Sequence, residues 1–335
     1  MISPGGSGTC KARVRQGRRG GVAAQHSGRH VAIFLDILTK VTLPIIALVA
    51  LGWAMQPRLK LDVGSLNRLQ VNVILPSFFL HTLSTSKQPL SVVGPTALFM
   101  VVQLLVLVPT GWLIAALFRM NPKTRPVVGH GMAYANVGFF GVPVTLLAFG
   151  PDYLIHVSIM AVFMAVMAVS VGVWLLAPGG TGLFAKLRTA FETPMIPAVV
   201  LGMVLRGFEV QLPPVLAQPV QLMGQTFAAL ALYTLGAQIA ASPVRHVRAG
   251  PQVLMVVLKF GLAPALTWAL ALQLGLPRDL IDMLVVLTAT PVGVIITIYC
   301  IEYDRDPDFI ASAVVITTVL SPLFVSGWIL LTRLI

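Results

Sequence analysis

Long apolar stretches, separated by short breaks rich in charged residues, proline and glycine, follow one another along almost the whole chain. A helix that spans a bilayer needs roughly 20 mostly apolar residues. Ten candidate spans result, of which the sixth is the shortest. They are 37–57, 66–85, 91–118, 127–149, 153–176, 193–208, 215–240, 249–275, 279–301 and 308–332. The pattern predicts an all-α polytopic membrane protein with ten transmembrane helices.

The two halves of the chain resemble each other. "LPIIALVALGW" resembles "IPAVVLGMVLR", "VVQLLVLVP" resembles "VVLKFGLAP", and "GVWLL" resembles "SGWIL", in the same order. The matched pairs lie 153, 155 and 154 residues apart: Pro44 and Pro197, Pro109 and Pro264, Trp174 and Trp328. A common offset predicts a duplicated five-helix unit. The expected divisions are residues 31–176, a short linker at 177–192, and residues 193–335.

Five helices is an odd number, so the second unit enters the membrane from the side opposite to the first. Such inverted repeats are typical of secondary transporters, whose substrate sites lie near the middle of the membrane between the repeats. Internal repetition therefore favours a carrier over a membrane-bound enzyme or sensor.

The fourth span contains "YANVGFFGVPV" at residues 134–144, directly after Gly129 and Gly131. Glycine and proline weaken a helix, and backbone groups released inside a bilayer need partners from protein or water. The repeat offset carries Asn136 to Pro291, in "TATPVGVIITIY" of the ninth span. Interruptions at matching places predict that helices 4 and 9 are broken and cross at a substrate site. The alternative is a tightly packed, glycine-rich helix with a proline kink.

At such a crossing, half-helix N-termini direct N–H groups and partial positive charge into the site. Asn136 adds a side-chain amide, which both donates and accepts hydrogen bonds. All eleven Asp and Glu residues lie at span ends or in loops, so no carboxylate is expected in mid-membrane for a cation. Lys259, inside the eighth span, either extends to the interface or supplies positive charge to an anion. These features favour an anionic substrate.

Composition agrees with the membrane class, since 57% of the residues are hydrophobic and only 10% are charged. The net charge of +12 would suggest nucleic acid in a soluble protein. Here the basic residues lie in the first 30 positions and in short loops, so no nucleic-acid partner is expected. With the N-terminus outside, cytoplasmic loops carry eleven Lys and Arg and the outer loops four. This asymmetry predicts N- and C-termini outside.

Residues 1–30 are basic and rich in glycine and serine, and they lack the apolar region of a signal peptide. We expect a disordered tail, or a reading frame that truly starts near Val31. His81, His130 and His156 lack metal-ligand spacing, and no nucleotide-binding loop is present, so neither a metal nor another cofactor is expected. "EYDRD" at 302–306 is expected to be a solvated loop, or else a gate at the cytoplasmic mouth.

"NVGFFGVP", together with "TATPVGVIITIYCIEYDRDPDFIASAVVITTVLSPL", resembles the auxin efflux carrier family, in particular its bacterial members. "LNRLQVNVILPSFFLHTLS" is similar to the second helix of that family. The resemblance covers about residues 32–335. It implies a scaffold of helices 1, 2, 6 and 7, a mobile transport domain formed by the others, a location in the bacterial inner membrane, and a homodimer through the scaffold.

The resemblance also implies a set of substrate-binding residues at the crossing. Asn136 and Pro291 stand there, with backbone presented by Val137, Gly138 and Val292. Pro143 and Thr290 of the same motifs are added to the predicted set, together with Lys259, which the charge argument above supplies and the resemblance does not. The long central loop and the acid–lysine pair in helix 3 of some plant members have no counterpart here. A small carboxylate such as malate or malonate is therefore expected in place of auxin.

Two other functions stay open at this stage. A sodium-coupled carrier of the bile acid type would share crossed, broken helices and could bind sodium through carbonyl and amide oxygens. An integral-membrane enzyme acting on lipid would need a cluster of acids or histidines at one membrane face, and only "EYDRD" approaches that. The leading hypothesis is an alternating-access secondary carrier of small organic anions.

Overall fold

The computed structural model describes residues 32–176, 194–242 and 247–335, with the backbone alone for residues 168–176. Every regular element in these ranges is a helix, and the only extended pairing among them is one isolated bridge. The predicted all-α class is confirmed. The N-terminal tail and the linker at 177–192 lie outside the described residues.

The first half of the chain contains helices that correspond to the first five predicted spans. Their elements are η1 (Leu38–Thr42), α2 (Leu43–Leu59), α3 (Val63–Leu69), η2 (Gln70–Ile74), α4 (Leu75–Thr85), η3 (Leu90–Val92), α5 (Val93–Leu117), α6 (Arg125–Ala133), η4 (Val137–Gly141), α7 (Val142–Ala148), η5 (Pro151–Tyr153) and α8 (Leu154–Leu176).

The second half supplies the remaining helices. They are α10 (Met195–Gly207), α11 (Pro214–Gln225), α12 (Phe227–Ala241), α13 (Ala249–Val257), η6 (Leu258–Leu262), α14 (Ala263–Gln273), α15 (Arg278–Thr288), α16 (Ile295–Glu302) and α17 (Pro307–Leu334).

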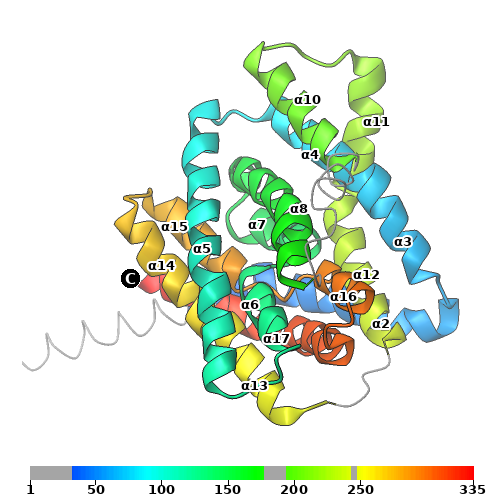
Figure 1. Cartoon of the computed structure of the whole chain (residues 1–335). Coiled ribbons are helices and arrows are strands. Elements are labelled where there is room, and N and C mark those ends of the chain that lie inside the picture. The colour runs from blue at the N-terminus through cyan, green and yellow to red at the C-terminus, as the bar shows by residue number, and fades with distance from the viewer. Residues whose placement is uncertain (1–31, 177–193, 243–246) are drawn as a thin grey trace, which may run out of the picture.

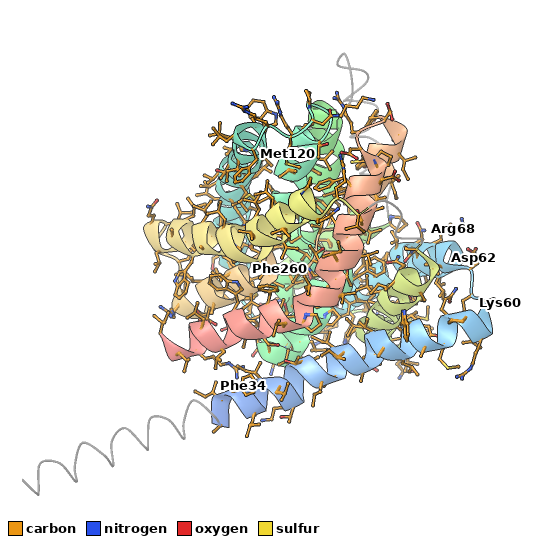
Figure 2. The ribbon with its side chains drawn as sticks, turned by 90° about the horizontal axis from the view of Figure 1, so that it is seen from below. Phe34, Lys60, Asp62, Arg68, Met120 and Phe260 are labelled. Atoms are coloured by element: carbon orange, nitrogen blue, oxygen red, sulfur yellow. The ribbon has the colours of Figure 1, made fainter. Side chains whose placement is uncertain are left out.

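Five continuous helical segments among the described residues are long and apolar enough to cross a membrane. They are Ala32–Leu59, Leu90–Leu117, Pro214–Ala241, Ala249–Gln273 and Pro307–Leu334. Figure 2 shows the first of them along one edge of the molecule, from Phe34 to Lys60. Met195–Gly207 is shorter, and the fourth and ninth predicted spans are interrupted. The chain therefore has several membrane-length helices, as a multi-pass protein requires.

One group of helices packs around two close crossings. α2 packs against α12, and α4 packs against α10 and α11 (Figure 1). At the first crossing, a Cβ on Gly52 would lie 1.9 Å from the Tyr233 carbonyl oxygen, and one on Gly236 would lie 1.9 Å from that of Val49. Only glycine lets the two backbones approach this closely. These helices are those of the expected scaffold, spans 1, 2, 6 and 7.

The other group contains α5 to α8 and α13 to α17, and its tightest contact is between α5 and α6. A Cβ on Gly111 would lie 2.9 Å from the Cα of Gly129, and one on Gly129 would lie 2.6 Å from the Val108 carbonyl oxygen. A Cβ on Gly131 would meet the Met255 side chain at 2.8 Å. Gly129 and Gly131 therefore serve helix packing, as the alternative reading of this span proposed, and they do not cause its interruption.

Four prolines each follow a widened helical turn. In η1, η2, η4 and η6, the residue just before proline donates its N–H to the carbonyl five residues back. Proline has no N–H and its ring crowds the carbonyl four residues earlier, so a wider turn relieves the clash. The prolines concerned are Pro44, Pro76, Pro143 and Pro264. Pro109, in contrast, lies within the continuous helix α5.

Candidate functional site

Two helices of the second group are interrupted in the middle. α6 ends at Ala133, and helical structure resumes at Val137 after three residues. α15 ends at Thr288, and α16 begins at Ile295. Both predicted interruptions are present. The first is shorter than expected, because Gly138, Gly141 and Pro143 already belong to the second half-helix.

The interrupted segments meet and pair with each other. Ala135 and Val292 form an antiparallel bridge, the Asn136 N–H donates to the Pro291 carbonyl at 2.8 Å, and the Gly293 N–H donates to the Tyr134 carbonyl at 3.3 Å. Each segment thus satisfies backbone groups that the other has released from its helix. Inside a bilayer this mutual pairing is what makes two broken helices tolerable.

Asn136 lies at the centre of this crossing with only 7% of its surface exposed. Its Oδ1 accepts from the Phe139 N–H at 3.3 Å, and its main-chain carbonyl accepts from Phe140 and Gly141. Asn136 is therefore the N-cap of the second half-helix. Its Nδ2 is buried and makes no hydrogen bond with any described residue. A buried amide donor without an acceptor is costly, so the hydrogen-bonding capacity of Nδ2 is unmet within the described residues.

Gly138 offers a second donor beside Asn136. Its N–H makes no hydrogen bond to another described residue, and a Cβ built on it would have nothing within 4 Å. It lies in the first turn of the second half-helix, where unsatisfied N–H groups carry partial positive charge. The Asn136 amide and the Gly138 N–H are thus adjacent donors at a helix N-terminus.

The other predicted residues of the two motifs have different roles. The Val137 N–H donates to the Ala135 carbonyl at 2.8 Å, and the Val292 N–H donates to the Thr317 hydroxyl at 3.2 Å. The Thr290 hydroxyl donates to the Leu287 carbonyl at 2.7 Å. Their donors are therefore already engaged. Pro143 is buried in the first turn of α7, where it follows the widened turn η4.

Lys259 is fully buried, with none of its surface exposed, so the expectation that it extends to the interface is wrong. Its Nζ donates to the Met132 carbonyl at 3.4 Å. Met132 lies in the last turn of α6, so the amine sits at the C-terminal end of the first half-helix. The donors of Asn136 and Gly138 lie on the other side of the break.

Charge elsewhere in the interior is scarce. Among the described residues, Lys259 is the only buried Lys or Arg, and no Asp or Glu is buried. No group of three or more metal-ligating side chains occurs in the described ranges. The described interior therefore contains one buried amine and no buried carboxylate.

A cavity of about 180 Å³ reaches Val294, the residue after Gly293 of the crossing, but Asn136, Gly138 and Lys259 are not among its lining residues. Val294, directly before α16, lines it together with residues of α3, α12, α16 and α17. Its polar lining residues are Asn67, Gln238, Ser242, Thr297 and Thr318. The cavity therefore lies between the two groups of helices. It is smaller than the pockets of about 300–1,000 Å³ that hold drug-sized ligands.

The "EYDRD" segment joins several helix ends. Asp304 pairs with Lys123, while Asp306 pairs with Arg248 and accepts from the Thr124 hydroxyl. The hydrogen bond from Lys123 lowers the pKa of the Asp304 carboxyl below its ordinary value. These contacts connect the loop before α6 and the start of α13 to the start of α17. The segment is thus tied into the second helix group.

Sequence reasoning missed the roles of Tyr134 and Gly293. A Cβ on Gly293 would lie 2.3 Å from the Tyr134 ring, so the aromatic ring and the glycine fit only as a pair. His130 is fully buried, stacks on Tyr134 at 5.5 Å between ring centroids, and has no hydrogen-bond partner among the described residues. Tyr134 and Gly293 both lie within the quoted motifs, and this location could have identified them from the sequence.

Comparison with known proteins connects this arrangement to transport. Residues 181–329 match a family model described as "Membrane transport protein". A "Putative malonate transporter" of Rhizobium meliloti is 26% identical over 312 residues, covering 88% of this chain and 96% of that protein. An "Uncharacterized transporter" of Methanothermobacter thermautotrophicus is 25% identical over 304 residues, covering 87% and 97%.

A plant protein matches over a shorter region. A "Probable auxin efflux carrier component 5b" of Oryza sativa is 28% identical over 146 residues, which is 42% of this chain and 40% of that protein. The matched family is one of membrane transport and not of catalysis. The described residues also contain several membrane-length apolar helices, as a multi-pass membrane protein requires.

Proposed function

We propose that this chain, a membrane transport protein of the auxin efflux carrier family, is a secondary transporter that moves small organic anions by alternating access. The observation that carries the proposal is the buried Asn136 Nδ2 without an acceptor, at the point where two broken helices cross. A carboxylate oxygen of the substrate would accept from Nδ2 and from the Gly138 N–H. The adjacent half-helix N-terminus favours negative charge at the same position.

Three further observations support an anion of small size. The described interior contains a buried lysine and no buried carboxylate, which disfavours a cationic substrate. The cavity beside the crossing measures about 180 Å³. One relative that matches over most of its length is named as a "Putative malonate transporter". A mono- or dicarboxylate with few carbon atoms fits these observations better than auxin.

The proposed movement is elevator-like, with the second helix group sliding against the first. In support, the first helix of each half packs on the second helix of the other half. Helix 1 packs on helix 7 (α2 on α12), and helix 6 packs on helix 2 (α10 on α4). Within each half, the contact of α5 with α6 corresponds to the contact of α14 with α15. An inverted duplication predicts this correspondence. The crossing lies within the moving group, and the cavity lies between the two groups.

We further propose that the protein is a homodimer through helices 1, 2, 6 and 7 in the bacterial inner membrane, with both termini outside. The family resemblance and the eleven-to-four loop charge asymmetry support this arrangement. The molar mass of the protein part in detergent, from light scattering, would test it. A value near the 35.8 kDa of a single chain would contradict the dimer.

The test of the proposed function is counterflow in proteoliposomes. Vesicles loaded with unlabelled malonate, malate, succinate or lactate are diluted into the same labelled acid, with protein-free vesicles as the control. We expect at least one acid to accumulate transiently inside vesicles that contain the protein. If none of the acids accumulates, while labelled organic cations do, the anion assignment is wrong.

A sodium-coupled carrier of the bile acid type is the remaining alternative. The Gln103 amide donates to the Thr267 and Thr288 hydroxyls, both at 2.7 Å, in a buried cluster of oxygens between α5, α14 and α15. Replacing sodium by choline on both sides of the membrane separates the possibilities. Transport that persists in choline excludes sodium coupling, whereas transport that disappears establishes it.

A further inference from the structure

The inference concerns Lys259, which lies in the widened turn η6 directly before Phe260. Figure 2 labels Phe260 near the middle of the view. The side chain of Lys259 is fully buried, and within the described ranges its amine donates only to the Met132 carbonyl, at 3.4 Å. Pro264 fixes this turn, because the residue before it donates to the Leu258 carbonyl. The lysine is therefore held inward by the helix geometry.

The elements that pack against η6 are α13, α14, α6 and α17. α13 and α14 contain no titratable residue. α6 contributes Arg125 and His130, and α17 contributes Asp308 and Arg333. Of these four side chains none is bonded to the Lys259 amine in the described structure.

Each of those four groups has its own surroundings. Arg125 donates to the Met120 carbonyl, and Arg333 pairs with Asp36. Asp308 is exposed at the start of α17, and the buried His130 ring stacks on Tyr134. No carboxylate therefore neutralises Lys259 from any neighbouring element.

A buried ammonium needs a compensating negative charge, and the Met132 carbonyl supplies only part of one. It belongs to the C-terminal end of α6, where unsatisfied carbonyls carry partial negative charge. Uncompensated buried charge is unfavourable enough that such groups tend to release their proton. When no anion is present, the neutral amine is therefore the favoured form.

An anion at the crossing changes this balance. Met132 is four residues before Asn136, so the amine and the proposed carboxylate site flank the same break in one helix. A negative charge there stabilises the ammonium, and the ammonium stabilises the anion. By thermodynamic linkage, the bound anion raises the affinity of Lys259 for a proton, and the bound proton raises the affinity of the protein for the anion by the same factor.

We propose that Lys259 is the proton carrier of this transporter, so that one proton moves with the anion in each cycle. The neutral amine takes one proton from water on the side from which the anion binds. The ammonium and the anion cross together with the second helix group. On the other side the anion leaves, the ammonium returns its proton to water, and the empty carrier comes back with a neutral amine.

This inference rests on the proposed anion transport, and the experiment separates the two. Proteoliposomes loaded with a pH-sensitive dye receive labelled malonate, with the outside more acidic than the inside. Both solutions stay well above the second pKa of malonate, which its first carboxylate raises, so the substrate remains fully ionised. Malonate counterflow without a pH gradient is measured on the same vesicles and reports anion transport alone.

Three variants decide between a proton carrier and a fixed charge. Lys259→Met removes the titrating group, and Lys259→Arg keeps a charge that cannot be released. Lys40→Met is the matched control, because Lys40 also lies in a widened turn but is exposed and paired with Asp36. Gradient-driven uptake and malonate-dependent proton influx should fall about tenfold or more in both Lys259 variants, within the usual range of coupled binding. Both should be unchanged in Lys40→Met.

Gradient-driven uptake that falls much further than counterflow in Lys259→Met supports the proposal, and an unchanged melting temperature shows that the variant is folded. An equal loss of uptake and counterflow in that variant makes Lys259 a fixed binding charge and overturns the proposal. Uptake in Lys259→Arg that equals wild type overturns the proposal, since arginine cannot release the proton. Wild-type protein that exchanges malonate without moving protons overturns it as well, while leaving the anion carrier intact. Wild-type protein that exchanges no malonate removes the proposed malonate transport and the inference together.

Discussion

At the scale of single residues, the two atoms of the Asn136 side-chain amide have different roles. Its Oδ1 holds the Phe139 N–H and so starts the second half-helix, while its Nδ2 is left without a partner among the described residues. An aspartate at this position would still cap the second half-helix, because aspartate and asparagine are both good N-cap residues. Substitutions at this position can therefore separate helix capping from substrate binding.

The first prediction follows from this division. Asn136→Asp should preserve the thermal stability of the protein in detergent and reduce carboxylate counterflow by at least about tenfold. The lost hydrogen bond to a charged group is worth roughly 1.5–3 kcal/mol, and about 1.4 kcal/mol is one decade. Repulsion between two carboxylates adds to the loss. The exposed Asn72→Asp is the control and should transport like wild type.

Asn136→Ala should behave in the opposite way. Removal of the cap should lower the free energy of unfolding by about 0.5–2 kcal/mol. Transport should fall less than in Asn136→Asp, because no like charge is introduced. Equal counterflow of Asn136→Asp and wild type would remove the main support for an anion carrier.

Two glycines of the crossing give a second prediction, since only one of them has space around it. A Cβ on Gly138 meets nothing within 4 Å, whereas one on Gly293 would lie 2.3 Å from the Tyr134 ring. Gly138→Ala should leave the melting temperature unchanged or raise it, because alanine favours a helix by up to about 1 kcal/mol. It should weaken transport by filling the space beside the free N–H. Gly293→Ala should lower the melting temperature instead.

Counterflow and thermal melting of the two purified variants check this contrast. A stable Gly138→Ala protein with wild-type affinity for the carboxylate would show that the substrate does not approach this N–H. Equal melting temperatures for the two variants would show that Tyr134 moves aside easily.

At the scale of elements, proline explains more of the helix geometry than glycine does. The sequence indicated both interruptions, because Asn, Gly and Pro cluster at matching places in the two halves. It did not indicate their extent. Pro143 widens a turn in η4 without breaking the helix, so the break before it is confined to Tyr134, Ala135 and Asn136.

The direction of Lys259 was equally inaccessible from sequence. Its position inside an apolar span allowed both an interfacial and an inward side chain. Which way the Lys259 side chain points depends on how the helix formed by α13, η6 and α14 is rotated relative to α6. A hydropathy pattern does not report that rotation. The resemblance to the auxin efflux carrier family, in contrast, is confirmed, because its motifs are contiguous residues that can be compared directly.

The third prediction concerns the contact between α5 and α6, which holds the first half-helix in place. Gly129→Ala should destabilise the protein by about 1–3 kcal/mol, the usual cost of overpacking. The added methyl would lie 2.6 Å from the Val108 carbonyl oxygen, a backbone atom that cannot turn away. Gly261→Ala, whose Cβ would meet nothing within 4 Å, is the control. Thermal melting in detergent measures both, and equal values would contradict this packing argument.

At the scale of the whole molecule, the predicted repeat specifies which loops of the two halves should correspond. Lys87, after α4, and Ala241, at the end of α12, are separated by close to the repeat offset of about 154 residues. The same holds for Lys123, before α6, and Pro277, before α15. All four residues are exposed. An inverted duplication predicts that the members of each pair lie on opposite sides of the membrane.

The last prediction tests this relation by cysteine labelling. In a variant with Cys10 and Cys300 replaced by alanine, single cysteines at positions 87 and 277 should react with a membrane-impermeant maleimide in intact cells. Cysteines at positions 123 and 241 should react only after permeabilisation. An odd number of membrane crossings between equivalent positions requires this alternation, and the cationic loops fix its direction, because Lys and Arg are retained on the cytoplasmic side. If both members of either pair reacted from the same side, the inverted repeat would be wrong. Reversed labelling of all four would keep the repeat and invert only the proposed orientation.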